Sequence, residues 1–304
     1  MIRLTRRAAL GSAAALPFAA ALPARAEAPR LDPSHPTVRR FDLGDLQVTV
    51  LLANTLTNPT PPQEIFGMDV DAETFAQVSR DAFIPDDVSQ FFFTPTLVNT
   101  GDSLILFDTG QTGADIARVI EQAGHSTDQV DTVVLTHMHG DHIGGLMTDG
   151  TPTFANASYV TGQTEYDAWA AMESEGFETN VRPLADRMTF LSDGDDVVSG
   201  VTAQAAFGHT PGHMMYRLSS GDRSLMLTAD MTNHYVWSLA HPDWEVKFDM
   251  DKAAAAETRR RVLGMLAEER MPMIGYHMPF PAIGYVETRG DGFHWVPESY
   301  QMML

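Results

Sequence analysis

The chain of 304 residues contains no cysteine, and lysine occurs only at positions 247 and 252. Without cysteine there is no disulfide framework, no thiolate metal site and no cysteine nucleophile. A bound metal would therefore take histidine and carboxylate ligands, which suit zinc and its first-row neighbours. No apolar run is long enough to cross a bilayer, so we expect no membrane span.

Positive charge is also scarce, because 20 basic residues stand against 40 acidic ones and the net charge is −20. Residues 1–26 contain four of the arginines and no acid, so the rest of the chain carries a net charge of −24. A surface this acidic repels phosphate backbones, which argues against nucleic acid as a substrate or partner.

The segment 1–26 is typical of an export signal. It has a basic start that includes Arg6 and Arg7, continues through an Ala- and Leu-rich stretch, and ends at 24–26 in a small-residue cleavage pattern. The run TRRAAL resembles a twin-arginine signal, and a membrane anchor is the alternative. We therefore expect a signal at 1–26, one domain at 27–304, and a periplasmic or secreted protein.

The rest of the chain mixes strand and helix patterns, which is typical of a layered α/β domain. Segment 96–110 predicts a hairpin around an Asn-Thr-Gly-Asp turn, and 131–136 is an apolar, β-branched run of the buried kind. Further strands are expected at 46–53, 157–161, 201–206, 213–218, 224–229 and 272–276, and helices at 72–82, 114–124, 163–173 and 251–269. The aromatic-rich segment 57–93 predicts either a lid or a contact in a homodimer.

The stretch THMHGDHIGG collects four side chains that bind metals, namely His137, His139, Asp141 and His142. His137 and His139 are separated by one residue, so both side chains point the same way in an extended segment. The stretch follows the apolar strand at 131–136, and α/β folds place their active sites at such strand ends. This spacing can direct two ligands at one cation and two at a second.

Three later segments place similar side chains next to apolar strands. FGHTPGHMMY carries His209 and His213, LMLTAD ends in Asp230, and MIGYHMPF contains His277. Each residue alone is more typical of a loop hydrogen bond than of a metal ligand. Together with the first motif, they predict a shared metal centre.

These motifs and their order resemble those of the metallo-β-lactamase fold superfamily, over essentially the whole of residues 27–304. The resemblance implies an αβ/βα sandwich and a catalytic domain with its metals at one edge. Carried over by position, the first metal takes His137, His139 and His213, the second takes Asp141, His142 and His277, and Asp230 bridges both.

Several polar residues near these motifs are expected to support the site or the fold without binding metal. The resemblance leaves His209 outside the ligand set, as a residue that stabilises its turn or supports a ligand. Asp108 in FDTG is expected to orient the site or to stabilise a turn. His234 and His294 are expected to be structural histidines, and the mixed-charge segment 257–270 is expected to face solvent.

A pair of divalent cations would supply the reaction's nucleophile, because each lowers the pKa of a shared water and makes hydroxide available. No serine or cysteine is then required, and Asp141 is the candidate to hold the proton of that water. Zinc is the first choice of metal, while manganese, iron or cobalt also suit five histidines and two aspartates. The predicted reaction is hydrolysis of an ester-like bond.

The C-terminal third, in DMTNHYVWSLAHPDWEVKFDMD, YHMPFPAIGYV and FHWVPESY, resembles methyl parathion hydrolases and their lactonase relatives. The resemblance implies a small neutral substrate, either a phosphotriester, a lactone or an aryl ester, in an aromatic-lined pocket. Candidate walls are Phe91, Phe92, Phe93 and Trp169, which ordinary core packing would also explain. Between FDTG and QVDTV the chain is shorter than those hydrolases, which keeps a lactone or aryl ester open as the native substrate.

Other classes of function remain open at this point. β-Lactams are disfavoured, because true β-lactamases of this fold generally lack a bridging carboxylate such as Asp230. A metal-dependent binding protein without catalysis would keep the same ligands. An oxidoreductase or sulfur dioxygenase with a single iron could use the same scaffold.

Overall fold

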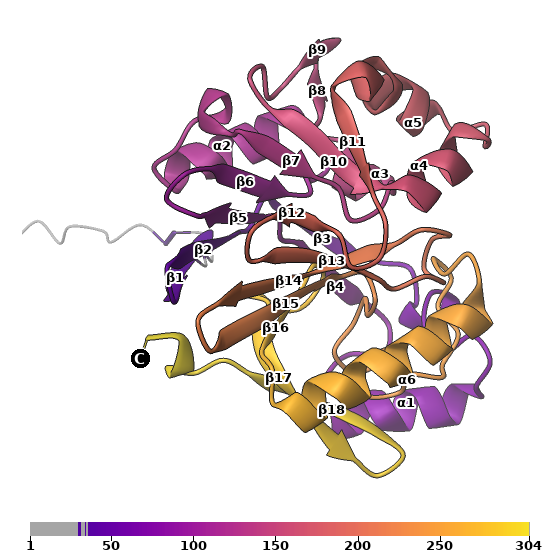
Figure 1. Ribbon diagram of the computed structural model, residues 1–304. Coiled ribbons are helices and arrows are strands. Elements are labelled where there is room, and N and C mark those ends of the chain that lie inside the picture. Colours follow the sequence, from indigo (N-terminus) through magenta and orange to yellow (C-terminus); the bar gives the residue numbers. More distant parts are fainter. Residues whose placement is uncertain (1–29, 32–33, 35, 304) are drawn as a thin grey trace, which may run out of the picture. The chain divides into compact units, whose positions relative to one another are not determined.

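The computed structural model describes residues 30, 31, 34 and 36–303, so the predicted signal at 1–26 lies outside the described residues. Residues 36–303 contain two seven-stranded sheets that face each other (Figure 1). The first sheet has the order β1 (Val38–Leu43), β2 (Leu46–Leu51), β5 (Thr96–Asn99), β6 (Leu104–Phe107), β7 (Thr132–Val134), β10 (Ser158–Gly162) and β11 (Met188–Leu191). The second has the order β12 (Asp196–Val198), β13 (Val201–Ala205), β14 (Met214–Ser220), β15 (Arg223–Ala229), β16 (Met273–Gly275), β17 (Ile283–Arg289) and β18 (Gly292–Pro297).

Helices cover the outer faces of the two sheets, which confirms the predicted αβ/βα sandwich (Figure 1). The first sheet carries α2 (Gly113–Gln122), α3 (Gly140–Ile143), α4 (Gln163–Ala170) and α5 (Glu175–Asn180), and the second carries α6 (Lys252–Glu269). Outside the sheets lie α1 (Ala72–Asp81), the hairpin β3 (Asn54–Asn58) and β4 (Ser89–Phe93), and the hairpin β8 (Met147–Thr148) and β9 (Thr151–Pro152). Short 3₁₀ helices lie at Pro62–Glu64, Thr127–Gln129, Arg182–Arg187 and Gln301–Met303.

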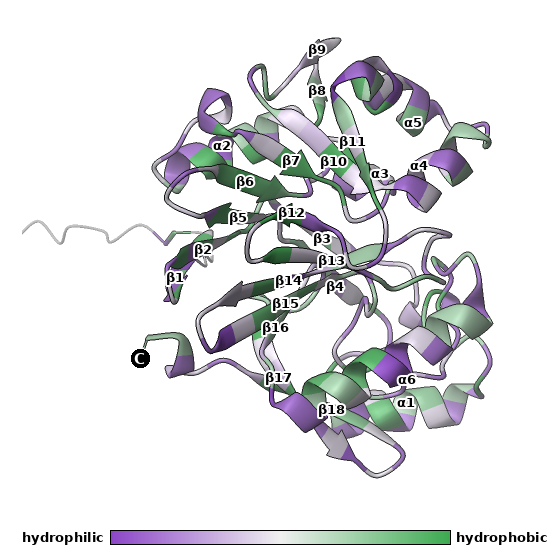
Figure 2. Ribbon diagram, viewed as in Figure 1, coloured by the Kyte–Doolittle hydropathy of each residue, from purple (hydrophilic) through white to green (hydrophobic). Residues whose placement is uncertain are grey.

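Two apolar cores hold the layers together. One joins the inner faces of both sheets, through residues such as Val48 and Leu218, and extends to Leu263 of α6. The other packs the outer face of the first sheet, including Leu106, against Ile116 and neighbouring residues of α2. Figure 2 shows the same pattern, because the most hydrophobic residues concentrate in the strands of both sheets.

The hairpin and the buried strand predicted next to the first motif are both confirmed. β5 and β6 pair antiparallel around Gly101, whose φ of +88° favours glycine. β7 pairs in parallel with β6 on one side and with β10 on the other. A parallel strand covered on both faces reads as a continuous apolar run, which explains why 131–136 shows no alternation.

The helices form where capping and apolar spacing agree. The side chain of Thr112 accepts a hydrogen bond from the Asp115 N–H at the start of α2, and Ile116, Val119 and Ile120 then share its buried face. α4 ends at Ala170, three residues before the predicted end at 173. Within the described residues, no helix is long and apolar enough to cross a membrane.

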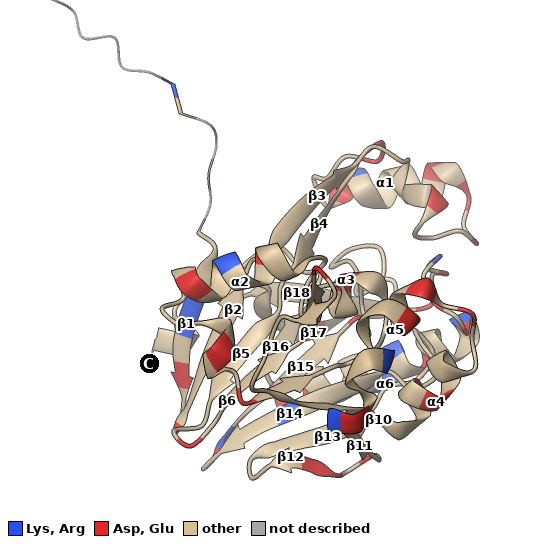
Figure 3. Cartoon of the chain, turned by 90° about the horizontal axis from the view of Figure 1, so that it is seen from above, with Lys and Arg blue, Asp and Glu red and all other residues tan. Residues whose placement is uncertain are grey.

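The segment 54–93 forms an extension of the sandwich, made of β3, α1 and β4 (Figure 3). Its aromatic residues are largely buried within the chain. Phe66 and Phe75 pack on Trp237, with ring centroids 5.4 and 5.2 Å apart respectively. The irregular sequence of this segment therefore encodes a small third core, whose Phe91 also reaches the functional site.

Candidate metal centre

The predicted site residues converge at one edge of the sandwich, because they follow the ends of neighbouring strands. His137 lies three residues after β7, Asp230 directly follows β15, and His277 lies two residues after β16. β15 and β16 are parallel neighbours, so their carboxyl ends meet at the same edge. Seven donor side chains gather there in groups whose ligand atoms lie within 4.8 Å of one another: His137, His139, Asp141, His142, His209, Asp230 and His277.

Three of these residues, His137, His139 and His209, are called the imidazole group below. His139 Nδ1 lies 3.1 Å from His137 Nε2 and 2.9 Å from His209 Nε2. All three ring nitrogens therefore point at one small volume. Burial lowers the pKa of His139 to about 3 and the pKa of His137 well below its usual value, so these rings are neutral at neutral pH.

Hydrogen bonds on the far side of two rings determine which nitrogen carries the proton. His209 Nδ1 lies 3.0 Å from a carboxylate oxygen of Asp249 and donates to it, so Nε2 is the nitrogen that faces His139. The hydroxyl of Thr136 already donates to Asp108, so His137 Nδ1 donates to that hydroxyl and its Nε2 has a lone pair. His139 Nδ1 can donate to only one of the two, so unshared lone pairs face each other, as a cation site requires.

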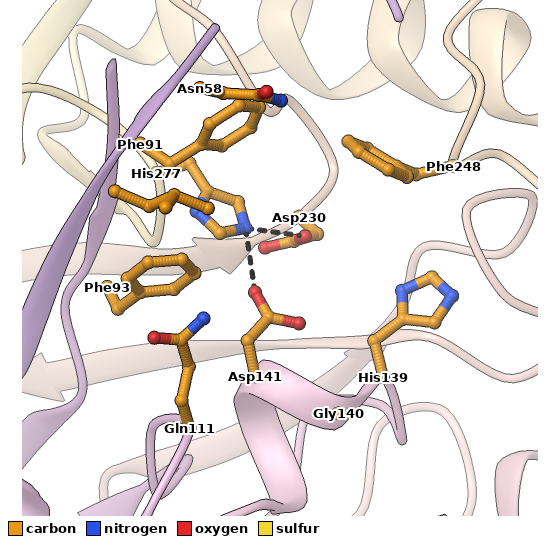
Figure 4. A pocket seen from close by; sticks show the side chains of 11 residues that line it. Asn58, Phe91, Phe93, Gln111, His139, Gly140, Asp141, Asp230, Phe248 and His277 are labelled. Carbon is orange, nitrogen blue, oxygen red and sulfur yellow. Dashed lines mark hydrogen bonds and ion pairs between the residues drawn. The ribbon is translucent and has the colours of Figure 1, made fainter. Parts of the chain in front are cut away.

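The other donors, Asp141, His142, His277 and Asp230, are called the mixed group, because they combine imidazole and carboxylate. His277 Nε2 lies 3.3 Å from Asp141 Oδ2 and 3.1 Å from Asp230 Oδ2 (Figure 4). His142 Nε2 lies 3.3 Å from Asp230 Oδ1, and both of these buried atoms lack a hydrogen-bond partner. Buried polar atoms without partners are rare, and a shared cation would satisfy both.

Asp230 connects the two groups. Its Oδ2 lies 3.5 Å from His209 Nε2 and 4.0 Å from His137 Nε2, in addition to its contact with His277. The Asn233 amide donates to the same oxygen at 3.0 Å and fixes the orientation of the carboxylate. Asp230 thus has the position of a bridge between the groups.

The pKa values of the mixed group's histidines shift in the opposite direction from those of His137 and His139. Burial alone would lower the pKa of His277, but the carboxylates of Asp230 and Asp141 outweigh it and raise the pKa to about 10. Burial raises the pKa of Asp141, and the nearby His142 and His277 outweigh it and lower that pKa to about 2. The two carboxylates therefore give the mixed group an excess of negative charge, which protons or a divalent cation can neutralise.

The contacts of His209 and His213 differ. His209 shares the imidazole group, whereas His213 belongs to none of the donor groups of the described residues. His213 Nε2 instead accepts the backbone N–H of Asp230 at 3.2 Å. His213 directly precedes β14, and its Nδ1 is buried without a hydrogen-bond partner among the described residues, whereas His209 lies in the loop before it. The assignment of His213 to the first metal stays a prediction, and the structure adds His209 as a second candidate ligand.

Asp108 has the supporting position that the sequence suggested. Its carboxylate accepts hydrogen bonds from the Thr136 N–H and from His142 Nδ1, each at 2.9 Å. It fixes the ring of His142 so that Nε2 faces the mixed group. Asp108 and Ala229, which precedes Asp230, have φ values of 59° and 45°. Such left-handed backbone is unfavourable for residues other than glycine and is often found at functional sites.

Sequence reasoning missed three residues that hold the ligand loops. The buried carboxylate of Glu165 accepts from the Met138 N–H at 3.0 Å, and from the Thr210 hydroxyl and the Gly212 N–H at 2.8 Å each. It therefore ties the loop of His139 to the loop of His209.

The other two missed residues support His209 directly. Arg259 donates to Asp249 at 2.6 Å, and Asp249 accepts from His209. Both are almost fully buried, so Arg259 contradicts the expectation that segment 257–270 simply faces solvent. Arg259 is flanked by Thr258 and Arg260, so no local pattern in the sequence marks it as buried.

A cavity of about 540 Å³ opens beside the donor groups (Figure 4). Its lining residues are Leu56, Asn58, Phe91, Phe93, Gln111, His139, Gly140, Asp141, Asp230, Phe248 and His277. Among these described residues there is no lysine or arginine. The cavity therefore combines a metal-binding floor with an apolar aromatic wall and suits a neutral ligand.

Two of the four predicted wall residues lie elsewhere. Phe91 and Phe93 line the cavity, but Phe92 lines a separate cavity with His234, because successive side chains of β4 point to opposite faces. Trp169 packs edge-on against His139 and donates from its indole N–H to Glu165 at 2.6 Å. Trp169 thus supports a loop of the site from behind.

His234 has the structural role expected of it. Its Nδ1 accepts the backbone N–H groups of Val236 and Trp237, at 3.1 and 3.2 Å. Burial lowers its pKa to about 3. His294 lies on β18 and belongs to none of the donor groups among the described residues.

Comparison with known proteins identifies the class to which this fold and site belong. The model of the metallo-beta-lactamase superfamily matches residues 94–273, which is more than half of the chain. The chain therefore belongs to the metallo-beta-lactamase superfamily, as the motifs predicted.

Individual relatives within the superfamily are distant. The lactamase-like protein nscB of Neosartorya fischeri is 30% identical over 151 residues, which are 48% of this chain and 39% of that protein. The match thus spans about two fifths of this curated relative's length.

Two solved structures are similar over most of the chain. AidC, described as a dizinc quorum-quenching lactonase, has 26% identity and a TM-score of 0.80, and the similarity covers 87% of this chain and 98% of AidC. The hydrolase AbOPH has 25% identity and a TM-score of 0.81, with 88% and 100% covered.

Proposed function

We propose that this protein is a hydrolase that binds two divalent cations and cleaves a small neutral ester, which is a lactone, an aryl ester or a phosphotriester. The observation that carries the proposal is the convergence of two donor groups at the floor of an aromatic cavity whose described lining residues include no lysine or arginine. The similarity to a dizinc lactonase and to the hydrolase AbOPH supports the same reaction class.

The residues present fit a pair of cations. His137 and His139 would hold one, together with His213 as the motifs predict or with His209, which shares their donor group. Asp141, His142 and His277 would hold the other, and Asp230 would join them. When bound, such cations lower the pKa of water and polarise an ester oxygen. Zinc is our first choice, because imidazole and carboxylate ligands suit it, and manganese, iron and cobalt are the alternatives.

The protein's own side chains would orient the reaction. Asp141 lines the cavity, and its side chain is 24% exposed, whereas that of His277 is 6% exposed. Because its pKa is lowered to about 2, the carboxylate is ionised and can accept a hydrogen bond from an attacking water. Its backbone carbonyl accepts from the Tyr276 hydroxyl at 2.6 Å, which holds the Asp141 loop in place.

The test combines metal analysis with a substrate screen. The purified protein is freed of metal, reloaded with zinc, manganese, iron or cobalt, and assayed on lactones, aryl esters and phosphotriesters. We expect two metal ions per chain and turnover of at least one ester class, with a large loss in Asp141→Asn. Two bound metals without any ester turnover would favour a binding protein, and one iron with oxygen consumption would favour an oxidoreductase.

We further propose that residues 1–26 direct export to the periplasm. The paired Arg6 and Arg7 and the cleavage pattern at 24–26 support this proposal. Replacing both arginines by lysine should block export, as measured by fractionating cells. Export that continues unchanged would contradict the proposal.

A further inference from the structure

A second cavity, called the rear cavity below, has a volume of about 220 Å³ and is lined by residues from three segments, 84–92, 234–237 and 277–279. It contains Phe92 of β4, whereas the cavity beside the donor groups contains Phe91 and Phe93. Because successive side chains of a strand point to opposite faces, β4 contributes one face to each cavity. The rear cavity is therefore separate from the cavity that holds the donor groups.

His234 gives the rear cavity a hydrogen-bond donor with a fixed direction. Its Nδ1 accepts the backbone N–H groups of Val236 and Trp237, so the proton of the neutral ring is on Nε2. The ring also stacks on Trp237, with centroids 4.0 Å apart. Among the described residues no group accepts a hydrogen bond from Nε2, and protein atoms do not fully enclose this nitrogen. Because the ring lines the rear cavity, its N–H is available to an acceptor there.

The rest of the lining determines the charge and size of a suitable ligand. Aromatic rings come from Phe92, Tyr235 and Trp237, and no described lining residue is a lysine, an arginine or an acid. Burial lowers the pKa of His234 to about 3, so this ring is neutral at neutral pH. A charged ligand would lose its hydration here without gaining an opposite charge. An apolar cavity of about 150 Å³ can bind benzene, so the rear cavity has room for one substituted ring.

His277 borders both cavities but offers the rear cavity no free hydrogen-bonding group. Its Nε2 faces the carboxylates of Asp141 and Asp230, and its Nδ1 donates to the backbone carbonyl of Phe92 at 2.8 Å. A molecule in the rear cavity would therefore contact His277 while both nitrogens keep their present partners. His234 remains the residue that can orient such a molecule by a hydrogen bond.

We propose that the rear cavity is a second binding site, which takes a neutral molecule with one aromatic ring and an oxygen acceptor, such as a phenol. The Nε2–H of His234 donates to the oxygen, and the ring of the ligand packs against Phe92 and Trp237. This site goes beyond the proposed function, because binding there requires neither a metal ion nor the cleavage of an ester.

The test measures binding of 4-fluorophenol to the purified, metal-loaded protein by fluorine NMR near pH 7, where a phenol is neutral. We expect saturable binding in the wild type. 4-Fluorobenzoate has the same ring but a negative charge, and it should bind at least about tenfold more weakly. His234→Asn keeps an acceptor for the backbone N–H groups but removes the Nε2–H, so it should weaken 4-fluorophenol binding about five- to tenfold.

A matched pair of substitutions locates the bound probe. Val88→Trp fills the rear cavity and should abolish binding, whereas Leu56→Trp fills the cavity beside the donor groups and should leave binding unchanged. Neither Val88 nor Leu56 is fully buried, so each position has space for a larger side chain at the surface. The thermal unfolding temperature of each variant is measured in parallel, and Val88→Phe replaces Val88→Trp if the latter is unstable.

Three results would overturn the inference: no binding to the wild type, binding that Leu56→Trp abolishes and Val88→Trp keeps, or full binding by a stable His234→Asn variant. The first two mean that the rear cavity holds no such ligand, and the third means that His234 does not orient it. Because the experiment measures binding and not turnover, these results leave the proposed hydrolase untouched. A protein that binds 4-fluorophenol as expected but hydrolyses no ester would support this inference and contradict the proposed function.

Discussion

The imidazole group and the mixed group lie side by side but differ in charge. Burial keeps the rings of His137 and His139 neutral, whereas the carboxylates of Asp141 and Asp230 raise the pKa of His277 to about 10. The imidazole group therefore offers neutral nitrogen ligands, and the mixed group offers negative charge. We infer that the imidazole group selects for metals that favour nitrogen, while the mixed group accepts a wider range of divalent cations.

The largest effect is expected from Asp230, which contacts both groups. Asp230→Asn keeps the shape of the side chain but removes the negative charge that the two sites would share. We expect metal content to fall below one ion per chain and ester hydrolysis to fall by more than about a hundredfold. Elemental analysis and steady-state kinetics check this. If the variant retains two metal ions per chain, the two groups bind metal independently of the Asp230 charge.

Replacing His209 or His213 by alanine tests how the imidazole group is composed. His209→Ala should lose one metal ion per chain, because it removes a ring nitrogen that lies 2.9 Å from His139. His213→Ala should retain both ions, although it should be less stable because the Asp230 N–H loses its acceptor. Metal analysis and the absorption spectrum of the cobalt-loaded variants decide. The reverse pattern would show that His213 is the ligand, as the motifs predict.

Smaller effects are expected from the two carboxylates that hold ligand rings from behind. Asp249→Asn weakens the support of His209 in the imidazole group, and Asp108→Asn weakens that of His142 in the mixed group. Each should reduce metal affinity about ten- to a hundredfold, and only for its own group. Competition with a chelator measures both affinities, and equal weakening of both ions by either variant would contradict two separable groups.

The smallest effect concerns a histidine that is buried outside both groups. The pKa of His234 is lowered to about 3, so the folded protein binds this proton less well than the unfolded chain. Its contribution to stability is full above about pH 6.5 and is lost as the pH falls towards 3. His234→Gln should make the unfolding free energy of the metal-free protein less pH-dependent, by about 1.4 kcal/mol per pH unit. Denaturant titrations at pH 4.5–7 measure the unfolding free energy of the wild type and the variant. If the two plots of unfolding free energy against pH are parallel, this prediction is wrong.

The sequence predicted the parts of the site that depend on local spacing. His137, His139, Asp141 and His142 lie in one turn after a buried strand, so their convergence follows from chain geometry alone. The position of His209 beside this turn could not be predicted this way, because it depends on how the loop before β14 packs against the turn.

Other parts of the site depend on contacts between distant segments. The Glu165 carboxylate accepts a hydrogen bond from the N–H of Gly212, 47 residues away in sequence. The Trp237 indole N–H donates to the Ser79 hydroxyl, 158 residues away. No periodic pattern marks such pairs. The hairpin that contains Phe91 and Phe93 was missed for the same reason, because it packs on an extension with its own core. Strand alternation would have separated Phe92 from its neighbours once β4 was known.

The carboxylate of Glu165 joins two loops that carry ligands of the imidazole group, through Met138 on one side and Thr210 and Gly212 on the other. The two loops therefore cannot open independently. The loops are then already ordered in the folded protein. The conformational entropy cost of ordering them would therefore be part of folding and not of metal binding. We therefore expect the folded, metal-free protein to bind a metal ion without first ordering these loops.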